Sequence, residues 1–108
     1  MSIEDRINQI LDNHVGDENA ISWMDLHGAI SWRDPIDPSE LRAIIKSMRK
    51  SGSLIASSSR GYSRPKSLKE AMTYIDRQFR NPAKDELKTA RIQRKIAREQ
   101  FGGQMGLW

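Results

Sequence analysis

Two prolines mark a boundary between two helical stretches of this chain. They stand in the segment Ser31 to Pro38, SWRDPIDP, and apolar residues at helical spacing lie on both sides of it. A residue that precedes proline is driven out of the helical region, so a helix cannot run on through Asp34. The segment therefore predicts a turn, with a short helix before it and an amphipathic helix after it.

The turn overlaps the second copy of an ISW-x-D motif that occurs twice in the chain. In the first copy, Ser22 and Asp25 form the S-x-x-D pattern of a helix start, which predicts a helix over about 23–30. Its inward-facing residues are expected to be Leu26, Ala29 and Ile30. The second copy cannot open a helix in this way, because Pro35 follows its aspartate. The two copies therefore have different structural roles.

Capping residues and helix breakers place the other helices. Ser2 and Asp5 form a capping box before an apolar stripe that runs to Val15, and either Asp37 or Ser39 caps the amphipathic helix after the turn. The stripe of that helix is Leu41, Ile44, Ile45 and Met48. Near the C-terminus, Ser67 and Glu70 cap a helix over about 68–80, and Asn81-Pro82 opens a last helix over about 82–100.

Between these helices, LIASSSRGYSRPKS predicts a short β-hairpin whose tip is Ser58 to Gly61. Helix, short helix, turn, amphipathic helix and hairpin is the order of a winged helix-turn-helix. The stretch LRAIIKSMRKSGSLIASSSRGY also resembles small winged helix-turn-helix proteins of bacteriophages and prophages, in which a helix ending in a basic residue and glycine leads into I-x-S-S-x-x-G-Y. The resemblance covers about Ser22 to Arg77.

The resemblance implies a mostly α fold in which three helices and a β-hairpin wing are followed by a C-terminal helical extension. We expect a winged helix-turn-helix domain over 1–66, a fourth helix over 67–80 packed on it, and a basic helical arm with an apolar tail over 81–108. The length of 108 residues supports one domain with a modest core.

The charge distribution points to a polyanionic partner. Residues 1–40 contain two basic and nine acidic residues, whereas 41–108 contain sixteen basic and five acidic ones, so the two parts carry −7 and +11. Such asymmetry is typical of a surface that faces nucleic acid, although a solvated Lys/Arg-rich helix has the same composition. With the resemblance, it predicts a sequence-specific or semi-specific double-stranded DNA-binding protein, acting as a transcriptional regulator or a replication accessory factor. The alternative is a protein-binding adaptor or inhibitor of a host factor.

Helical geometry selects the residues that would touch DNA. Opposite the apolar stripe of the amphipathic helix, Arg42 and Lys46 are the candidates for base edges, and the neighbouring polar residues suit phosphates. The predicted DNA-binding set is Ser39, Arg42, Lys46, Arg49 and Lys50 on the helix, with Ser58, Arg60 and Arg64 at or near the hairpin. The alternative for each cation is a solubilising role on an exposed face.

The last helix is strongly basic and has a ragged apolar stripe, so we expect it to have little apolar surface left to bury and to be dispensable for the fold. The arm is predicted to form a homodimer or bind a partner. Its contact residues are expected to be Ile92, Ile96, Phe101 and Trp108. DNA phosphates along Lys88, Arg91, Lys95 and Arg98 are the alternative.

Other kinds of site find little support in the sequence. The chain has no cysteine, and His14 and His27 lack the spacing of a zinc site, so we expect no metal and no cofactor. No catalytic motif occurs, which argues against an enzyme. For Trp23 and Trp32, packing is favoured over base stacking. No apolar run is long enough to span a membrane, and we expect the protein in the cytoplasm of a bacterial host cell.

Overall fold

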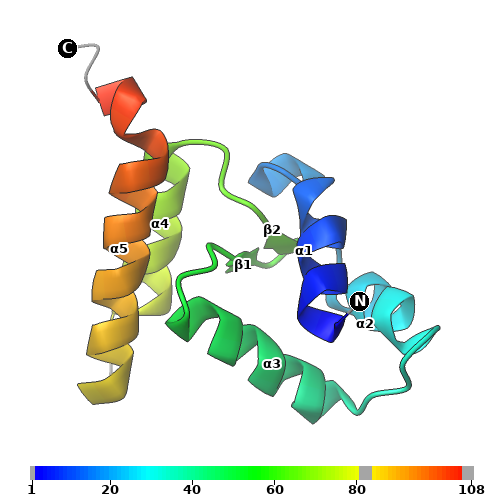
Figure 1. Cartoon of the computed structure of the whole chain (residues 1–108). Helices are drawn as coiled ribbons and strands as arrows, with labels where there is room; N and C mark the ends of the chain where they lie inside the picture. The colour runs from blue at the N-terminus through cyan, green and yellow to red at the C-terminus, as the bar shows by residue number, and fades with distance from the viewer. Residues whose placement is uncertain (1, 81–83, 106–108) are drawn as a thin grey trace.

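The computed structural model describes residues 2–80 and 84–105, where the chain is mostly helical with one small antiparallel hairpin (Figure 1). The elements are α1 (Ile3–Asp12), the short 3-10 helix η1 (Asp17–Asn19), α2 (Trp23–Ser31), α3 (Pro38–Lys50), β1 (Ala56–Ser58), β2 (Gly61–Ser63), α4 (Leu68–Gln78) and α5 (Lys84–Met105). In Figure 1, α4 and α5 stand side by side, α1 and α2 lie on the other side of the hairpin, and α3 crosses below. The prediction of a mostly helical chain with a hairpin is confirmed.

Serine side chains start three of the helices where the sequence predicts. Ser2 forms the capping box of α1, and the Ser22 and Ser67 hydroxyls accept backbone N–H groups in the first turns of α2 and α4. The start of α3 is different, because Asp37 is the N-cap residue but its side chain makes no capping hydrogen bond. Pro38 is the first residue of that helix and has no N–H to satisfy.

Arg6 of α1 holds the turn between α2 and α3. Its buried guanidinium donates to the carbonyl oxygens of Ile30 (3.0 Å) and Ala29 (2.6 Å), and it pairs with Asp34 at 2.7 Å. Those carbonyls belong to the last turn of α2, so Arg6 caps the C-terminal end of that helix. The aspartate of the second ISW-x-D copy therefore orients this arginine.

The side chain of Ala29 lies on the outside of α2, so the expectation that it faces inward is wrong. Leu26 and Ile30, four residues apart, form the buried stripe of the helix. Ala29 lies about 80° around the helix axis from the middle of this stripe, at its edge, and its side chain is exposed there.

The hairpin has its tip where the sequence predicts. Ala56 pairs with Ser63 and Ser58 with Gly61, which leaves Ser59 and Arg60 as the two-residue loop. A third chain segment adds to the hairpin, because the backbones of Ile21 and Tyr62 exchange two hydrogen bonds of 2.8 Å. The segment just before α2 is thereby attached to β2.

Two clusters of buried apolar residues form the core. The first joins α1, α2 and α3 to the start of the hairpin, and the second joins the hairpin to α4 and α5. The first consists of Ile7, Leu11, Leu26, Ile30, Leu41, Ile45, Met48 and Ile55. The second consists of Leu54, Ala56, Ala71, Tyr74, Ile75, Phe79, Ala90, Ala97 and Phe101.

Helix α5 belongs to the second cluster, so the expectation that it has little apolar surface to bury is wrong. Ala90, Ala97 and Phe101 are buried within the chain, and Ile96 packs against them. Phe101 is therefore a core residue instead of a partner contact, whereas Ile92 is 38% exposed. The reason is that α4 presents a continuous apolar face along which α5 packs. Asn81, Pro82 and Trp108 lie outside the described residues.

Candidate nucleic-acid interface

The outward face of α3 carries most of the predicted DNA-binding residues. Leu41, Ile45 and Met48 point into the core, and the opposite face is exposed. That face presents Ser39, Arg42, Lys46 and Lys50. Because Arg42 and Lys46 are one helical turn apart, their side chains project in similar directions from the same exposed surface.

Arg42 lies over an aromatic side chain from α2. Its guanidinium carbon is 4.5 Å from the ring centroid of Trp23, a cation–π distance. The Trp23 ring in turn stacks on His27 with a centroid separation of 6.0 Å and lies 5.8 Å from the Tyr62 ring of the hairpin. These contacts restrict the Arg42 side chain and hold the start of α2 between α3 and the hairpin.

A groove of about 290 Å³ opens at this junction. Its walls come from the start of α2, from α3 and from the hairpin loop. The lining residues are Ser22, Trp23, Arg42, Ser57, Ser58, Ser59, Arg60, Gly61 and Tyr62. Two arginines, four serines and two aromatic rings thus surround one depression. The Ser57 and Ser58 hydroxyls donate to Gln78 and Asp17, so the groove offers phosphate oxygens mainly its two cations, beside flat aromatic surfaces.

The hairpin tip is fixed by η1. The Ser58 hydroxyl donates to Asp17 Oδ1 at 2.6 Å and accepts the Arg60 N–H at 3.1 Å. Ser58 is therefore engaged in holding the tip. The Arg60 side chain is 63% exposed, and its Nε atom lies 3.9 Å from Asp17 Oδ2, at the outer limit of an ion pair. An exposed pair at this distance is weak, so Arg60 can exchange Asp17 for another anion.

Gly61 allows the hairpin to approach the segment before α2. Its φ angle is 129°, and an added Cβ would lie 2.0 Å from the carbonyl oxygen of Ile21. No side chain fits in that space. The glycine of the I-x-S-S-x-x-G-Y pattern is thus required by the close contact between Ile21 and Tyr62.

Arg49 has a different role from the one the sequence predicts. Its Nε donates to the Ile55 carbonyl at 2.9 Å, and its guanidinium lies over the Tyr62 ring at 5.9 Å and over the Tyr74 ring at 5.4 Å. The side chain therefore joins α3 to the hairpin and α4. Burial raises the pKa of Tyr74 to about 12, although the nearby Arg49 charge acts in the opposite direction.

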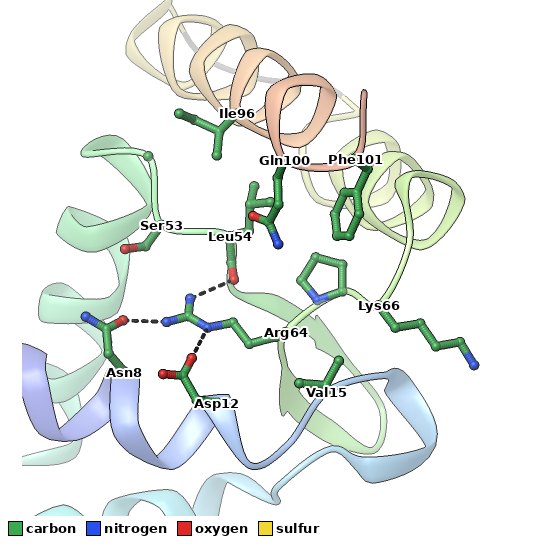
Figure 2. Close-up of a pocket in the computed structure, with 12 residues that line it drawn as sticks. Asn8, Asp12, Val15, Ser53, Leu54, Arg64, Lys66, Ile96, Gln100 and Phe101 are labelled. Atoms are coloured by element: carbon green, nitrogen blue, oxygen red, sulfur yellow. Dashed lines mark hydrogen bonds and ion pairs between the residues drawn. The ribbon is translucent and has the colours of Figure 1, made fainter. Parts of the chain in front are cut away.

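Arg64 is also committed to the fold, and Figure 2 shows its guanidinium pointing toward α1. It donates to the Leu54 carbonyl at 2.9 Å and to Asn8 Oδ1, and it pairs with Asp12 at 3.4 Å. Its side chain is only 19% exposed. It lines a groove of about 660 Å³ between α1 and α5, away from the hairpin loop. We therefore leave Arg64 out of the candidate interface.

The candidate interface then consists of the α3 face and the hairpin loop. The structure brings Arg42 and Arg60 together around the groove and places Ser39, Lys46 and Lys50 on the same exposed face of α3. It uses Arg49, Ser58 and Arg64 to hold elements in place. Trp23 and Tyr62 are half-buried and line the groove. The sequence favoured a packing role for Trp23. No local sequence pattern predicts that Arg42 lies over the Trp23 ring.

Neither histidine takes part in a cluster of metal ligands. His14 Nδ1 and His27 Nε2 each lie 2.7 Å from a backbone carbonyl oxygen, of Asn19 and Ile36 respectively. Over residues 2–80 and 84–105, no group of three or more His, Asp or Glu side chains could hold a metal ion.

Comparisons with protein-family models, curated proteins and solved structures find no match to this chain. A search of the described helices for membrane spans finds none that combines sufficient length with sufficient hydrophobicity.

Proposed function

We propose that this protein is a winged helix-turn-helix protein of phage or prophage type that binds double-stranded DNA in a sequence-specific or semi-specific way. It acts as a transcriptional regulator or as a replication accessory factor. The observation that carries the proposal is the position of the cationic face of α3 beside the exposed Arg60 of the hairpin loop, across a groove walled by Trp23. A helix and a loop that present cations on one surface suit a groove of double-stranded DNA and the phosphates on either side of it.

The order of elements supports the winged-helix assignment. Helix α1 is followed by a segment that pairs with the hairpin at Ile21, then by α2, α3 and the hairpin itself. In this arrangement α3 is the recognition helix and the loop at Ser59 and Arg60 is the tip of the wing. The resemblance of the α3 and hairpin sequence to small phage winged-helix proteins points in the same direction.

Each cation has a specific role in the proposal. Lys46 and Arg42 are placed to donate to acceptors on base edges, of which guanine O6 and N7 are the commonest partners. Arg42 loses little freedom on binding, because it already lies over Trp23. Arg60 contacts a phosphate or the minor groove, and Ser39 and Lys50 contact phosphates at the two ends of α3.

The direct test measures binding of the full chain to random duplex DNA at two salt concentrations. Fluorescence anisotropy of the labelled DNA is the readout. We expect binding at low salt that weakens steeply at high salt, because each phosphate contact releases a counterion. Absence of binding at low salt would refute the proposal and would leave the protein-binding adaptor or inhibitor as the better hypothesis.

Variants then separate the proposed roles. With a selected target sequence, Lys46→Ala should cost about 1–3 kcal/mol and relax the preference at one base. Arg60→Ala should weaken binding to all sequences and reduce the salt slope by about one. Arg91→Ala on the exposed face of α5 is the matched control and should change neither. A larger loss for Arg91→Ala than for Lys46→Ala would place DNA along α5 instead.

A further inference from the structure

The outer face of α2 leaves two large apolar side chains in water. Met24 is 82% exposed and Trp32, directly after the helix, is 86% exposed. Between them, four residues from each, Gly28 is exposed and has no atom within 4 Å of the place where a Cβ would stand. Residues at this spacing lie along one side of a helix. This face therefore carries two large exposed apolar side chains on either side of a position without one, and we call it the apolar strip of α2.

This strip lies opposite the buried side of α2. Leu26 and Ile30 point into the first core cluster, and Gly28 stands midway between them in sequence, about 160° from each around the helix axis. The strip thus points straight away from the protein. Large apolar side chains exposed together, rather than singly, mark a surface that another molecule covers.

We propose that this strip pairs with the same strip of a second copy of the chain, with the two α2 helices antiparallel and a two-fold axis at Gly28. Met24 and Trp32 are equally far from Gly28 along the helix. The two-fold axis therefore places Met24 of each copy against Trp32 of the other copy. Contacts that repeat in this way define a two-fold symmetric interface. The absence of a side chain at Gly28 lets the two helices approach closely where they cross.

The charges at the edge of the strip fit the same arrangement. Asp25 lies in the first turn of α2 and Arg33 lies just beyond its end, and both are exposed. In an antiparallel pair, Asp25 of each copy comes within reach of Arg33 of the other. DNA is a poor occupant, because the strip itself carries no cation and Asp25 borders it. The pairing is independent of the proposed DNA binding.

The test is sedimentation velocity of the full chain over a range of concentrations. We expect a reversible dimer, and Gly28→Gln should raise its Kd about tenfold or more, because a side chain then fills the crossing point. The matched control is Thr73→Gln on the exposed side of α4, which should leave the Kd unchanged. A chain that stays monomeric up to about 1 mM, or a dimer that Gly28→Gln does not weaken, would overturn the proposal.

A charge exchange tests the antiparallel orientation. Asp25→Arg and Arg33→Asp should each weaken the dimer, because each places like charges together, and the double variant should restore it. Far-UV circular dichroism confirms that every variant is folded. If the double variant is as weak as the single ones, the antiparallel pairing is wrong.

Discussion

Helices α2 and α5 differ in how the fold uses their apolar residues. Helix α5 is rich in Lys and Arg, yet Ala90, Ala97 and Phe101 are buried against α4 and the hairpin. Helix α2 has few charges, yet it leaves Met24 exposed and is followed by the exposed Trp32. Composition therefore did not decide which helix is covered.

The difference lies in what each helix packs against. Helix α4, eleven residues long, packs its apolar face against the 22-residue α5, and the end of α3 also contacts α5. Helix α2, nine residues long, is covered on one side only, where Leu26, Ile30 and the half-buried Trp23 face α1, α3 and the hairpin. The neighbours that pack on each side of a helix, and not its own composition, thus determine how much of it is buried.

The largest effect is expected from deleting α5. Truncation after Arg80 exposes Leu54, Tyr74 and Phe79, and burial of one large apolar side chain contributes about 1.5–3 kcal/mol. A domain of this size has only about 5–15 kcal/mol of stability, so the truncated chain should lose cooperative thermal unfolding. Truncation after Met105, which keeps α5, is the control. A shortened chain with an unchanged melting temperature would show that α5 is an accessory arm after all.

Single alanine variants compare the two helices directly. Phe101→Ala should lower the free energy of unfolding by about 3–5 kcal/mol, because it leaves a cavity beside α4. Trp32→Ala should change it by less than about 0.5 kcal/mol, because the side chain is exposed. Urea unfolding at a concentration where the chain is monomeric measures both. Equal losses would mean that Trp32 is covered within its own chain.

Helix α5 also contributes a buried polar contact. The Gln93 side chain is fully buried, and its Nε2 donates to the carbonyls of Arg49 (2.7 Å) and Ser53 (2.9 Å) at the end of α3. Gln93→Leu should cost about 1–3 kcal/mol, because it leaves these carbonyls with fewer partners. Gln100→Leu, at an exposed position of the same helix, should have little effect in the same urea experiment.

The smallest effect concerns the pH dependence of stability. The Tyr74 hydroxyl is buried without a hydrogen-bond partner in the described part of the chain, and its pKa is raised to about 12. The folded state therefore holds this proton more tightly than the unfolded state, where the pKa is about 10. The contribution of the Tyr74 hydroxyl to the free energy of unfolding is therefore fully present below about pH 10. It decreases as the pH rises toward about 12.

Comparison of the wild type with Tyr74→Phe isolates that contribution. Between pH 8 and pH 11 the wild type should lose about 1 kcal/mol more than the variant. Urea unfolding at the two pH values measures the difference. Identical losses in the two proteins would mean that Tyr74 is not buried by the packing of α4, α5 and the hairpin.

The sequence by itself determined the local features of this protein. The helix starts at Ser2, Ser22 and Ser67, the proline turn before α3, and the hairpin tip before Gly61 each depend on residues within a few positions of one another. Hydrogen bonds over such short spans form wherever the local residues allow them. The prediction that Arg42 and Lys46 lie on the exposed face of α3 also depended only on local spacing, because residues four positions apart lie on the same side of a helix.

Only the tertiary structure decided which polar side chains are structural and which are exposed. Arg6 pairs with Asp34, 28 residues away, and Gln93 caps the end of α3 from 44 residues away. Arg64 binds Asn8 across 56 residues, whereas Arg60, four residues earlier, stays exposed. Local pattern cannot distinguish these arginines, because an arginine becomes structural only where the fold places a carbonyl or carboxylate within its reach.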